Sequence, residues 1–138
     1  MSIKRSANAV WNGSGKEGKG TVSTASGVLN NSQYSFNTRF EDGIGTNPEE
    51  LIGAAHAGCF SMKLAFVLQA AGITADSIDT KAIVNLENGA INEIVLHTKV
   101  KAANLTAEDF ATYANDAKEN CPISKLFTAN IVLEAELV

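Results

Sequence analysis

Apolar residues dominate the stretch between Gly45 and Gly72. Asn47 suits a helix N-cap, Pro48 suits the first helical position, and Gly72 is typical of the residue that follows a helix. The pattern predicts a helix of about 24 residues, roughly 36 Å long, unless it is broken into two. No polar stripe runs along any face of this segment, which indicates a buried helix.

Charged residues within the same segment argue against a membrane span. Lys63 lies near its middle, where insertion of a charge costs roughly 2.5–3.5 kcal/mol, and Glu49 and Glu50 lie in its first turn. A helix that is apolar on every face needs cover on every side, and one thin sheet covers a single side. We therefore expect a homodimer in which two such helices share a core. The alternative is a sheet that wraps the helix within one chain.

Alternating polar and apolar positions predict strands on both sides of the helix. Before it, residues 3–11 alternate weakly, residues 21–24 form a second short strand, and residues 34–41 alternate clearly. In the third segment Arg39 falls on the face opposite the one formed by Tyr34, Phe36, Thr38 and Phe40. Arg39 is therefore expected to point away from the aromatic side chains.

After Gly72 the period changes from 3.6 to 2. Residues 78–87 and 93–101 read as antiparallel strands, and the Asn88-Gly89 pair between them is a strong hairpin signal. Each strand has one face that packs and one that is largely wet. Residues 130–137 read as a final strand.

Thr106 is expected to cap a second helix that ends near Asn120, because Pro122 cannot continue it. A further helical turn can open at Cys121, whose thiol would then lie near a helix N-terminus, where a thiol pKa is lowered. The order of strands, buried helix, hairpin, helix and strand predicts an α+β fold. The length fits a single domain over residues 1–138.

The charge and the composition of the chain limit the partners and cofactors that it is expected to bind. The net charge is −4 with lysines scattered among glutamates, so no basic field for nucleic acid is expected. No apolar segment follows the charged start of the chain, which favours the cytoplasm. In that reducing compartment, two cysteines are more often redox-active or inert than structural. The glycines do not fit a dinucleotide motif, and no cofactor is expected.

Cys59 lies at the centre of the long helix, and Cys121 follows 62 residues later. A cysteine on an apolar helix face is usually a small hydrophobic residue, and an apolar wall raises a thiol pKa. A reactive Cys59 therefore needs a cation. Lys63 and His56 each lie one helical turn away, but Arg39 is the better candidate because its guanidinium is always charged.

Arg39 would need a carboxylate to fix its orientation, and Glu49 in the first turn of the helix can supply one. The alternatives are a surface contact between Arg39 and Glu41, and a Glu49 that only complements the helix dipole. A zinc site from the two cysteines, His56 and His97 has the wrong spacing, so no metal is expected. His56 is expected to be a hydrogen-bonded core residue.

Three segments of the chain resemble the osmotically inducible protein C (OsmC) group of the OsmC/Ohr family, which are thiol peroxidases. They are KGTVSTASGVLN, YSFNTRFEDGIGTNPEELIGAAHAGCFSMKLAF and NCPISK. The resemblance extends over nearly the whole chain and is most specific in GTNPEELIGAAHAGCFSM. It implies an OsmC-like fold, with antiparallel sheets around a long central helix in an intertwined homodimer, and active sites at the subunit interface.

The resemblance also implies roles for four residues. Cys59 would be the peroxidatic nucleophile and Cys121 the resolving thiol, while Arg39 and Glu49 would activate Cys59 and orient the peroxide. The implied substrate is an organic hydroperoxide. A dithiol, in this family typically a dihydrolipoyl protein, would reduce the resulting Cys59–Cys121 disulfide.

Apolar neighbours of Cys59 suggest which hydroperoxide is preferred. Ile52, Met62 and Phe66 lie near Cys59 on the helical period and would bind alkyl or lipid hydroperoxides in preference to hydrogen peroxide. Two other classes stay open at this point: a stress protein that binds a small hydrophobic ligand and has incidental thiols, and a structural dimer.

Overall fold

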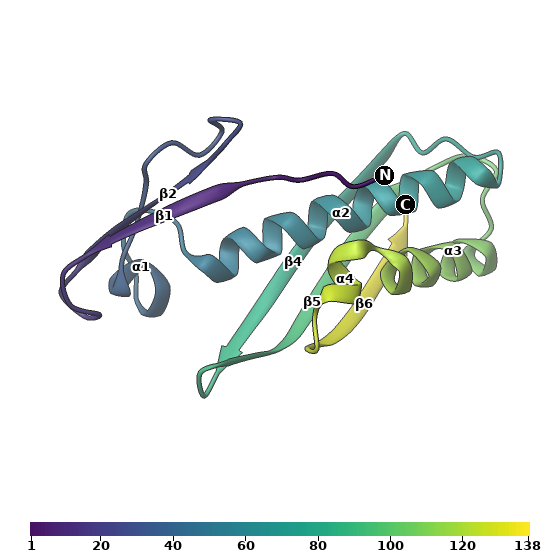
Figure 1. Ribbon diagram of the computed structural model, residues 1–138. Helices are drawn as coiled ribbons and strands as arrows, with labels where there is room; N and C mark the ends of the chain where they lie inside the picture. The colour runs from purple at the N-terminus through teal and green to yellow at the C-terminus, as the bar shows by residue number, and fades with distance from the viewer. The chain divides into compact units, whose positions relative to one another are not determined.

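The computed structural model describes residues 1–138. The chain forms two compact units, Met1–Leu51 and Ile52–Val138, and each contains one small sheet (Figure 1). The predicted α+β class is confirmed. A single domain over residues 1–138 stays a prediction.

The first unit is built on a three-stranded antiparallel sheet in the order β1-β2-β3. Trp11 and Tyr34 pack against each other on it, with ring centroids 5.4 Å apart. The first two strands were predicted, with slightly different bounds. The elements of this unit are β1 (Ala7–Asn12), β2 (Lys19–Thr24), β3 (Ser32–Tyr34) and α1 (Phe36–Phe40).

The strand predicted over residues 34–41 is wrong beyond Tyr34, because α1 takes its place. Ser35 and Thr38 form a capping box: the Thr38 N–H donates to the Ser35 hydroxyl at 3.3 Å, and the Ser35 N–H donates to the Thr38 hydroxyl at 2.8 Å. These bonds satisfy N–H groups that a helix start leaves open. The local hydrogen bonds therefore outweigh the alternating pattern.

The change from strand to helix also corrects the direction of Arg39. One helical turn brings Phe36 and Phe40 together, with ring centroids 4.8 Å apart. The guanidinium of Arg39 lies 5.2 Å from the centroid of the Phe40 ring. Arg39 therefore contacts an aromatic side chain rather than pointing away from all of them.

The long helix α2 (Pro48–Ala70) is a single unbroken element of 23 residues. The Asn47 side chain accepts a hydrogen bond from the Glu50 N–H at 2.8 Å, so the predicted N-cap is confirmed. Gly72 follows the helix with φ of 78°, a conformation that favours glycine.

Only one face of α2 is buried in the single chain, so the alternative of a sheet that wraps the helix within one chain is not observed, and burial of the other face in a homodimer stays a prediction. Met62 is 66% exposed and Phe66 is 60% exposed. By length and composition α2 would pass as a membrane span, but core helices pass the same test. The fully buried face is formed by residues four positions apart: His56, Phe60, Leu64 and Leu68.

The second unit contains a sheet in the order β4-β5-β6, formed by β4 (Ser77–Glu87), β5 (Ala90–Lys101) and β6 (Asn130–Leu137). The predicted hairpin is confirmed. Asn88 and Gly89 join its strands with φ of 52° and 77°, the positive values that a tight hairpin turn requires. The apolar face of β5 is buried, with Ile94, Leu96, Thr98 and Val100 facing the core.

The last strand, β6, pairs with β5 in parallel, whereas the sequence suggested only antiparallel neighbours. Parallel neighbours need a crossover connection, and two helices supply it: α3 (Ala107–Asn120) and α4 (Pro122–Leu126). Thr106 caps α3 by accepting from the Asp109 N–H at 3.2 Å, as predicted. Figure 1 shows β5, α3, α4 and β6 following one another in this order.

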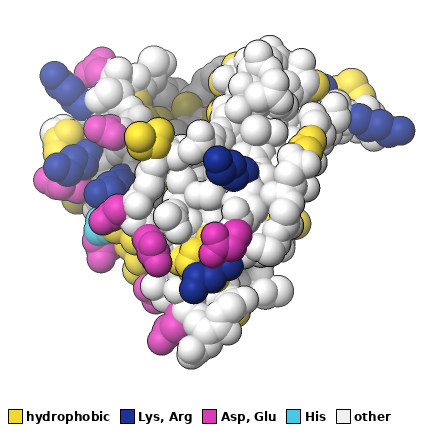
Figure 2. Space-filling view, turned by 90° about the vertical axis from the view of Figure 1, so that its left-hand side faces the viewer, with side chains coloured by type: hydrophobic (Ala, Val, Ile, Leu, Met, Phe, Trp, Pro, Cys, Tyr) yellow, Lys and Arg dark blue, Asp and Glu magenta, His cyan; other side chains and the backbone are white.

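Charged side chains are mixed on the face shown in Figure 2. Acidic groups, in magenta, lie among basic groups, in dark blue, with apolar atoms between them. This mixture agrees with the small net charge of −4.

Candidate active site

Arg39 on α1 and Glu49 in the first turn of α2 form a two-pronged ion pair in the first unit. Arg39 Nη2 donates to Glu49 Oε1 at 2.8 Å, and Arg39 Nε donates to the same oxygen at 3.0 Å. The expected contact is confirmed, and the alternative pairing with Glu41 is not formed. Glu49 is buried, whereas 40% of the Arg39 side chain is exposed. Arg39 Nη1 makes no hydrogen bond within the chain, so it remains available to a ligand.

An aromatic hollow of about 230 Å³ lies beside this guanidinium. The alternating pattern does not predict it, because residues 34–41 read as a strand and not as α1. The Ser35-x-x-Thr38 spacing, which is typical of a helix start, could have indicated the correct element. Besides Arg39, the main lining residues are Trp11, Tyr34, Phe36, Phe40 and Pro48.

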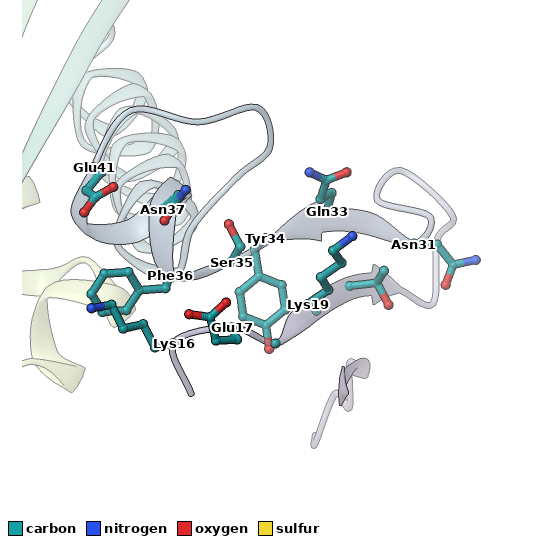
Figure 3. A pocket seen from close by; sticks show the side chains of 13 residues that line it. Lys16, Glu17, Lys19, Asn31, Gln33, Tyr34, Ser35, Phe36, Asn37 and Glu41 are labelled. Atoms are coloured by element: carbon teal, nitrogen blue, oxygen red, sulfur yellow. The ribbon is translucent and has the colours of Figure 1, made fainter. Parts of the chain in front are cut away.

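A larger hollow of about 670 Å³ in the first unit has a different character (Figure 3). Side chains of β2, β3, α1 and the loop before β2 line it, and they include lysines, glutamates and amides. No cysteine or histidine is among them. The hollow therefore offers no nucleophile of the kind that Cys59 can supply.

Cys59 and Cys121 meet in the second unit. The Cys121 thiol donates to the Cys59 sulfur at 2.8 Å, although the residues are 62 positions apart in the sequence. Cys59 is half-buried in the middle of α2, and Cys121 is fully buried at the junction of α3 and α4. Because a disulfide needs a sulfur–sulfur distance of about 2.0 Å, a small movement suffices to join them.

Opposing influences act on the Cys59 thiol. Burial raises its pKa above the ordinary value, and the neighbouring Cys121 raises it further, whereas the Ile123 N–H and the charge of Lys63 lower it. The net direction is upward, as the apolar wall predicted. The contact from the Ile123 N–H, at the start of α4, was not predicted from the sequence. Cys59 therefore needs more positive charge than its own unit supplies if it is to react as a thiolate.

His56 does not supply that charge. It is fully buried, and burial lowers its pKa, so the ring is neutral near pH 7. His56 Nε2 lies 2.7 Å from the Ser124 hydroxyl. The expectation of a hydrogen-bonded core histidine is confirmed.

The residues expected to bind substrate lie along α2 but are not gathered into one hollow. Ile52 is half-buried against the core, while Met62 and Phe66 are exposed. Phe66 lines an open hollow of about 450 Å³ together with Lys63 and other residues of α2 and α3.

His97 contacts a carboxylate and neither of the cysteines. It pairs with Glu134 on the neighbouring strand, with 2.7 Å between Nδ1 and Oε2. The chain contains no cluster of three His, Cys, Asp or Glu side chains arranged to hold a metal ion.

The chain combines a long helix that carries a cysteine with two small sheets. The sequence profile of OsmC-like protein matches residues 41–136, and the chain belongs to this family.

Two relatives and one solved structure describe its place in the family. The chain is 50% identical over 141 residues to Peroxiredoxin OsmC of Escherichia coli (strain K12), which covers 99% of both chains. It is 31% identical over 121 residues to the organic hydroperoxide resistance protein OhrB of Bacillus subtilis (strain 168), covering 86% of this chain and 88% of the relative. The OsmC-like protein of Mycoplasma pneumoniae has a similar structure, with a TM-score of 0.79 at 16% identity, covering 100% of this chain and 99% of that one.

Proposed function

We propose that this protein is a thiol peroxidase that reduces organic hydroperoxides to alcohols. The observation that carries the proposal is the contact between the sulfurs of Cys59 and Cys121 at 2.8 Å. The names of two relatives, a peroxiredoxin and an organic hydroperoxide resistance protein, support the reaction and the substrate class.

The proposed reaction has two steps in the protein. The Cys59 thiolate attacks the outer oxygen of the hydroperoxide, the O–O bond breaks, and the departing alkoxide takes a proton to become an alcohol. Cys59 is left as a sulfenic acid. Cys121 then attacks the sulfenic sulfur, the S–O bond breaks, water leaves, and a disulfide forms. An external dithiol, which we propose to be a dihydrolipoyl protein of the cytoplasm, reduces the disulfide by exchange.

Arg39 and Glu49 are proposed to activate Cys59 in the assembled protein. Glu49 fixes the guanidinium through Nε and Nη2, which leaves Nη1 to donate to a thiolate or a peroxide oxygen. The pKa of Cys59 is raised by burial, so an added fixed cation has a clear electrostatic use.

The assembly is proposed to be an intertwined homodimer with active sites at the subunit interface. Its support is the exposed apolar face of α2, which includes Met62 and Phe66. Large exposed apolar side chains on one helix are typical of a surface that another subunit covers. In the dimer, Ile52, Met62 and Phe66 are proposed to contact the organic part of the substrate.

Mass spectrometry after addition of one equivalent of cumene hydroperoxide tests this function. We expect loss of two hydrogens per chain and a peptide that links Cys59 to Cys121. Cys59→Ala should abolish hydroperoxide turnover while the protein stays folded, and Cys121→Ser should stop at the sulfenic acid after one turnover. Turnover that survives in Cys59→Ala would refute the proposal. Retained binding of an apolar ligand without turnover in the unmodified protein would instead support a binding protein.

A further inference from the structure

A buried polar pair lies one helical turn from the two cysteines. His56 on α2 is fully buried, and its Nε2 lies 2.7 Å from the hydroxyl of Ser124 on α4. The ring also packs edge-on against Phe127, at the end of α4, with 5.4 Å between centroids. The other ring nitrogen, Nδ1, is buried and has no hydrogen-bond partner.

Packing of the core alone does not explain why position 56 is a histidine. A buried polar atom without a partner is unfavourable, and an apolar side chain would fill the same volume without that cost. The tautomer with hydrogen on Nε2 donates to Ser124 and leaves only a lone pair at Nδ1. The neutral His56 thus makes one hydrogen bond, to Ser124, and its second nitrogen makes none.

The spacing of the pair matches the spacing of the cysteines. His56 precedes Cys59 by three residues on α2, and Cys121 precedes Ser124 by three residues at the start of α4. The sulfur contact and the His56–Ser124 bond therefore join the same two segments, one helical turn apart.

The short length of α4 makes this second contact important. A helix of five residues is not stable alone. Its N-cap, Cys121, makes no side-chain capping bond. The Cys121 N–H donates to the Ala117 carbonyl of α3 at 2.9 Å, and the rest of the position of Cys121 depends on what holds α4. The Ser124 hydroxyl ties the middle of α4 to α2.

We propose that His56 and Ser124 are positioning residues for disulfide formation, holding α4 so that the Cys121 sulfur stays within reach of the oxidised Cys59. This inference rests on the proposed function. The step needs no further oxidant: the Cys121 thiolate bonds to the Cys59 sulfur, the leaving group departs with the S–O electron pair, and it takes a proton to become water. Neither His56 nor Ser124 touches the atoms that react.

An aryl disulfide, dithiobis(nitrobenzoate), tests the positioning without any peroxide. The more exposed Cys59 attacks the reagent and releases one coloured nitrothiobenzoate, and Cys121 then displaces the second as the protein disulfide forms. The first release depends on reagent concentration, and the second does not. In Ser124→Ala we expect the second release to slow roughly tenfold or more, because small misplacements of reacting groups have large effects on rate. The first release should change less than the second, because Ser124 itself does not contact Cys59, although the Ile123 N–H of α4 does.

Two variants serve as controls. Ser61→Ala removes a hydroxyl of α2 that donates to Thr80 on β4 at 2.7 Å, away from α4, and both releases should keep the unmodified rates. Ser124→Thr restores the hydroxyl and should restore much of the second rate. Thermal unfolding of each variant checks that it is folded.

A second release in folded Ser124→Ala within about twofold of the unmodified rate would overturn the inference. If Ser124→Ala does not fold, the double variant His56→Leu with Ser124→Ala leaves no unpaired polar atom, and it should also slow the second release. An unmodified rate there would overturn the inference equally. A parallel measurement with cumene hydroperoxide separates the two proposals. If Ser124→Ala shows a slow second release but the unmodified protein does not turn over hydroperoxide, the peroxidase function is refuted and the positioning role is not.

Discussion

The reactivity of Cys59 depends on how charge is arranged around one sulfur. Burial raises its pKa, and the Ile123 N–H and Lys63 only partly oppose that effect. A thiol in this state is a weak nucleophile near pH 7, because the thiolate is the reactive form. In the proposed function, the further positive charge comes from the guanidinium of Arg39, which is permanently charged and which Glu49 holds in place.

Replacement of Arg39 tests this role. If Arg39 activates Cys59 as proposed, the pH midpoint for alkylation of Cys59 by iodoacetamide should move to higher pH in Arg39→Ala, because loss of the cation disfavours the thiolate. Arg39→Lys keeps the charge but loses the two-pronged contact, so its midpoint should lie between those of the unmodified protein and Arg39→Ala. An alkylation profile unchanged in Arg39→Ala would remove Arg39 from the activation of Cys59.

The buried His56 predicts a pH dependence of stability. Its folded pKa lies below the ordinary value of 6.5, so between the two values the unfolded chain binds a proton that the folded chain does not. The free energy of unfolding should therefore fall as pH decreases below about 6.5, by at most about 1.4 kcal/mol per pH unit from this group. Urea titrations across pH should show this slope reduced in His56→Leu with Ser124→Ala. An equal slope in both proteins would exclude His56 as the source.

Residue types and helical spacing predicted part of the candidate site. The Arg39–Glu49 contact was predictable because a guanidinium needs a carboxylate to orient it, and Glu49 lies in the first turn of the helix. The burial of His56 was predictable because its neighbours along the helix are apolar. The contact of the Ile123 N–H with the Cys59 sulfur was not predictable in this way. It depends on where a distant backbone segment lies, and the sequence pattern holds no local signal for that.

At the scale of elements, one side chain both caps α2 and links it to α1. Asn47 caps α2 through the Glu50 N–H, and its Nδ2 donates to the Thr38 carbonyl of α1 at 3.0 Å. These two helices carry Arg39 and Glu49. One asparagine thus has both a capping role and a linking role.

Two variants of Asn47 separate these roles. Asn47→Ala loses both, and urea unfolding should show a loss of about 1–2 kcal/mol, the usual range for a lost N-cap plus a hydrogen bond. Asn47→Asp keeps the capping oxygen but not the donor to Thr38, so its loss should be smaller. Equal losses in the two variants would show that the cap contributes little.

Elements with strong terminal signals were predictable, and those that depend on other parts of the chain were not. The cap at Asn47, the turn at Asn88-Gly89 and the cap at Thr106 identified α2, the hairpin and α3. The segment after Tyr34 misled because Phe36 and Phe40 share a face in a strand and also in a helix. The parallel pairing of β6 was missed because a strand's neighbour is set by the crossover and not by its own sequence.

At the scale of the whole molecule, the exposed apolar face of α2 predicts a dimer. Sedimentation equilibrium should give twice the chain mass of 14.5 kDa. Met62→Lys places a charge on that face and should shift the equilibrium toward single chains, because a buried unpaired charge is costly. Val28→Lys changes an equally apolar but highly exposed residue in a turn and should leave the mass unchanged. Particles of 14.5 kDa alone in the unmodified protein would contradict the prediction.

The 62-residue separation of Cys59 and Cys121 has a thermal consequence. A covalent link between them would close a large ring and remove many conformations from the denatured ensemble, an entropic effect of about 4 kcal/mol for a ring of this size. The oxidised protein would then resist heat better than the reduced protein. The disulfide form of the protein would therefore stay folded at higher temperature until a reductant restores the two thiols.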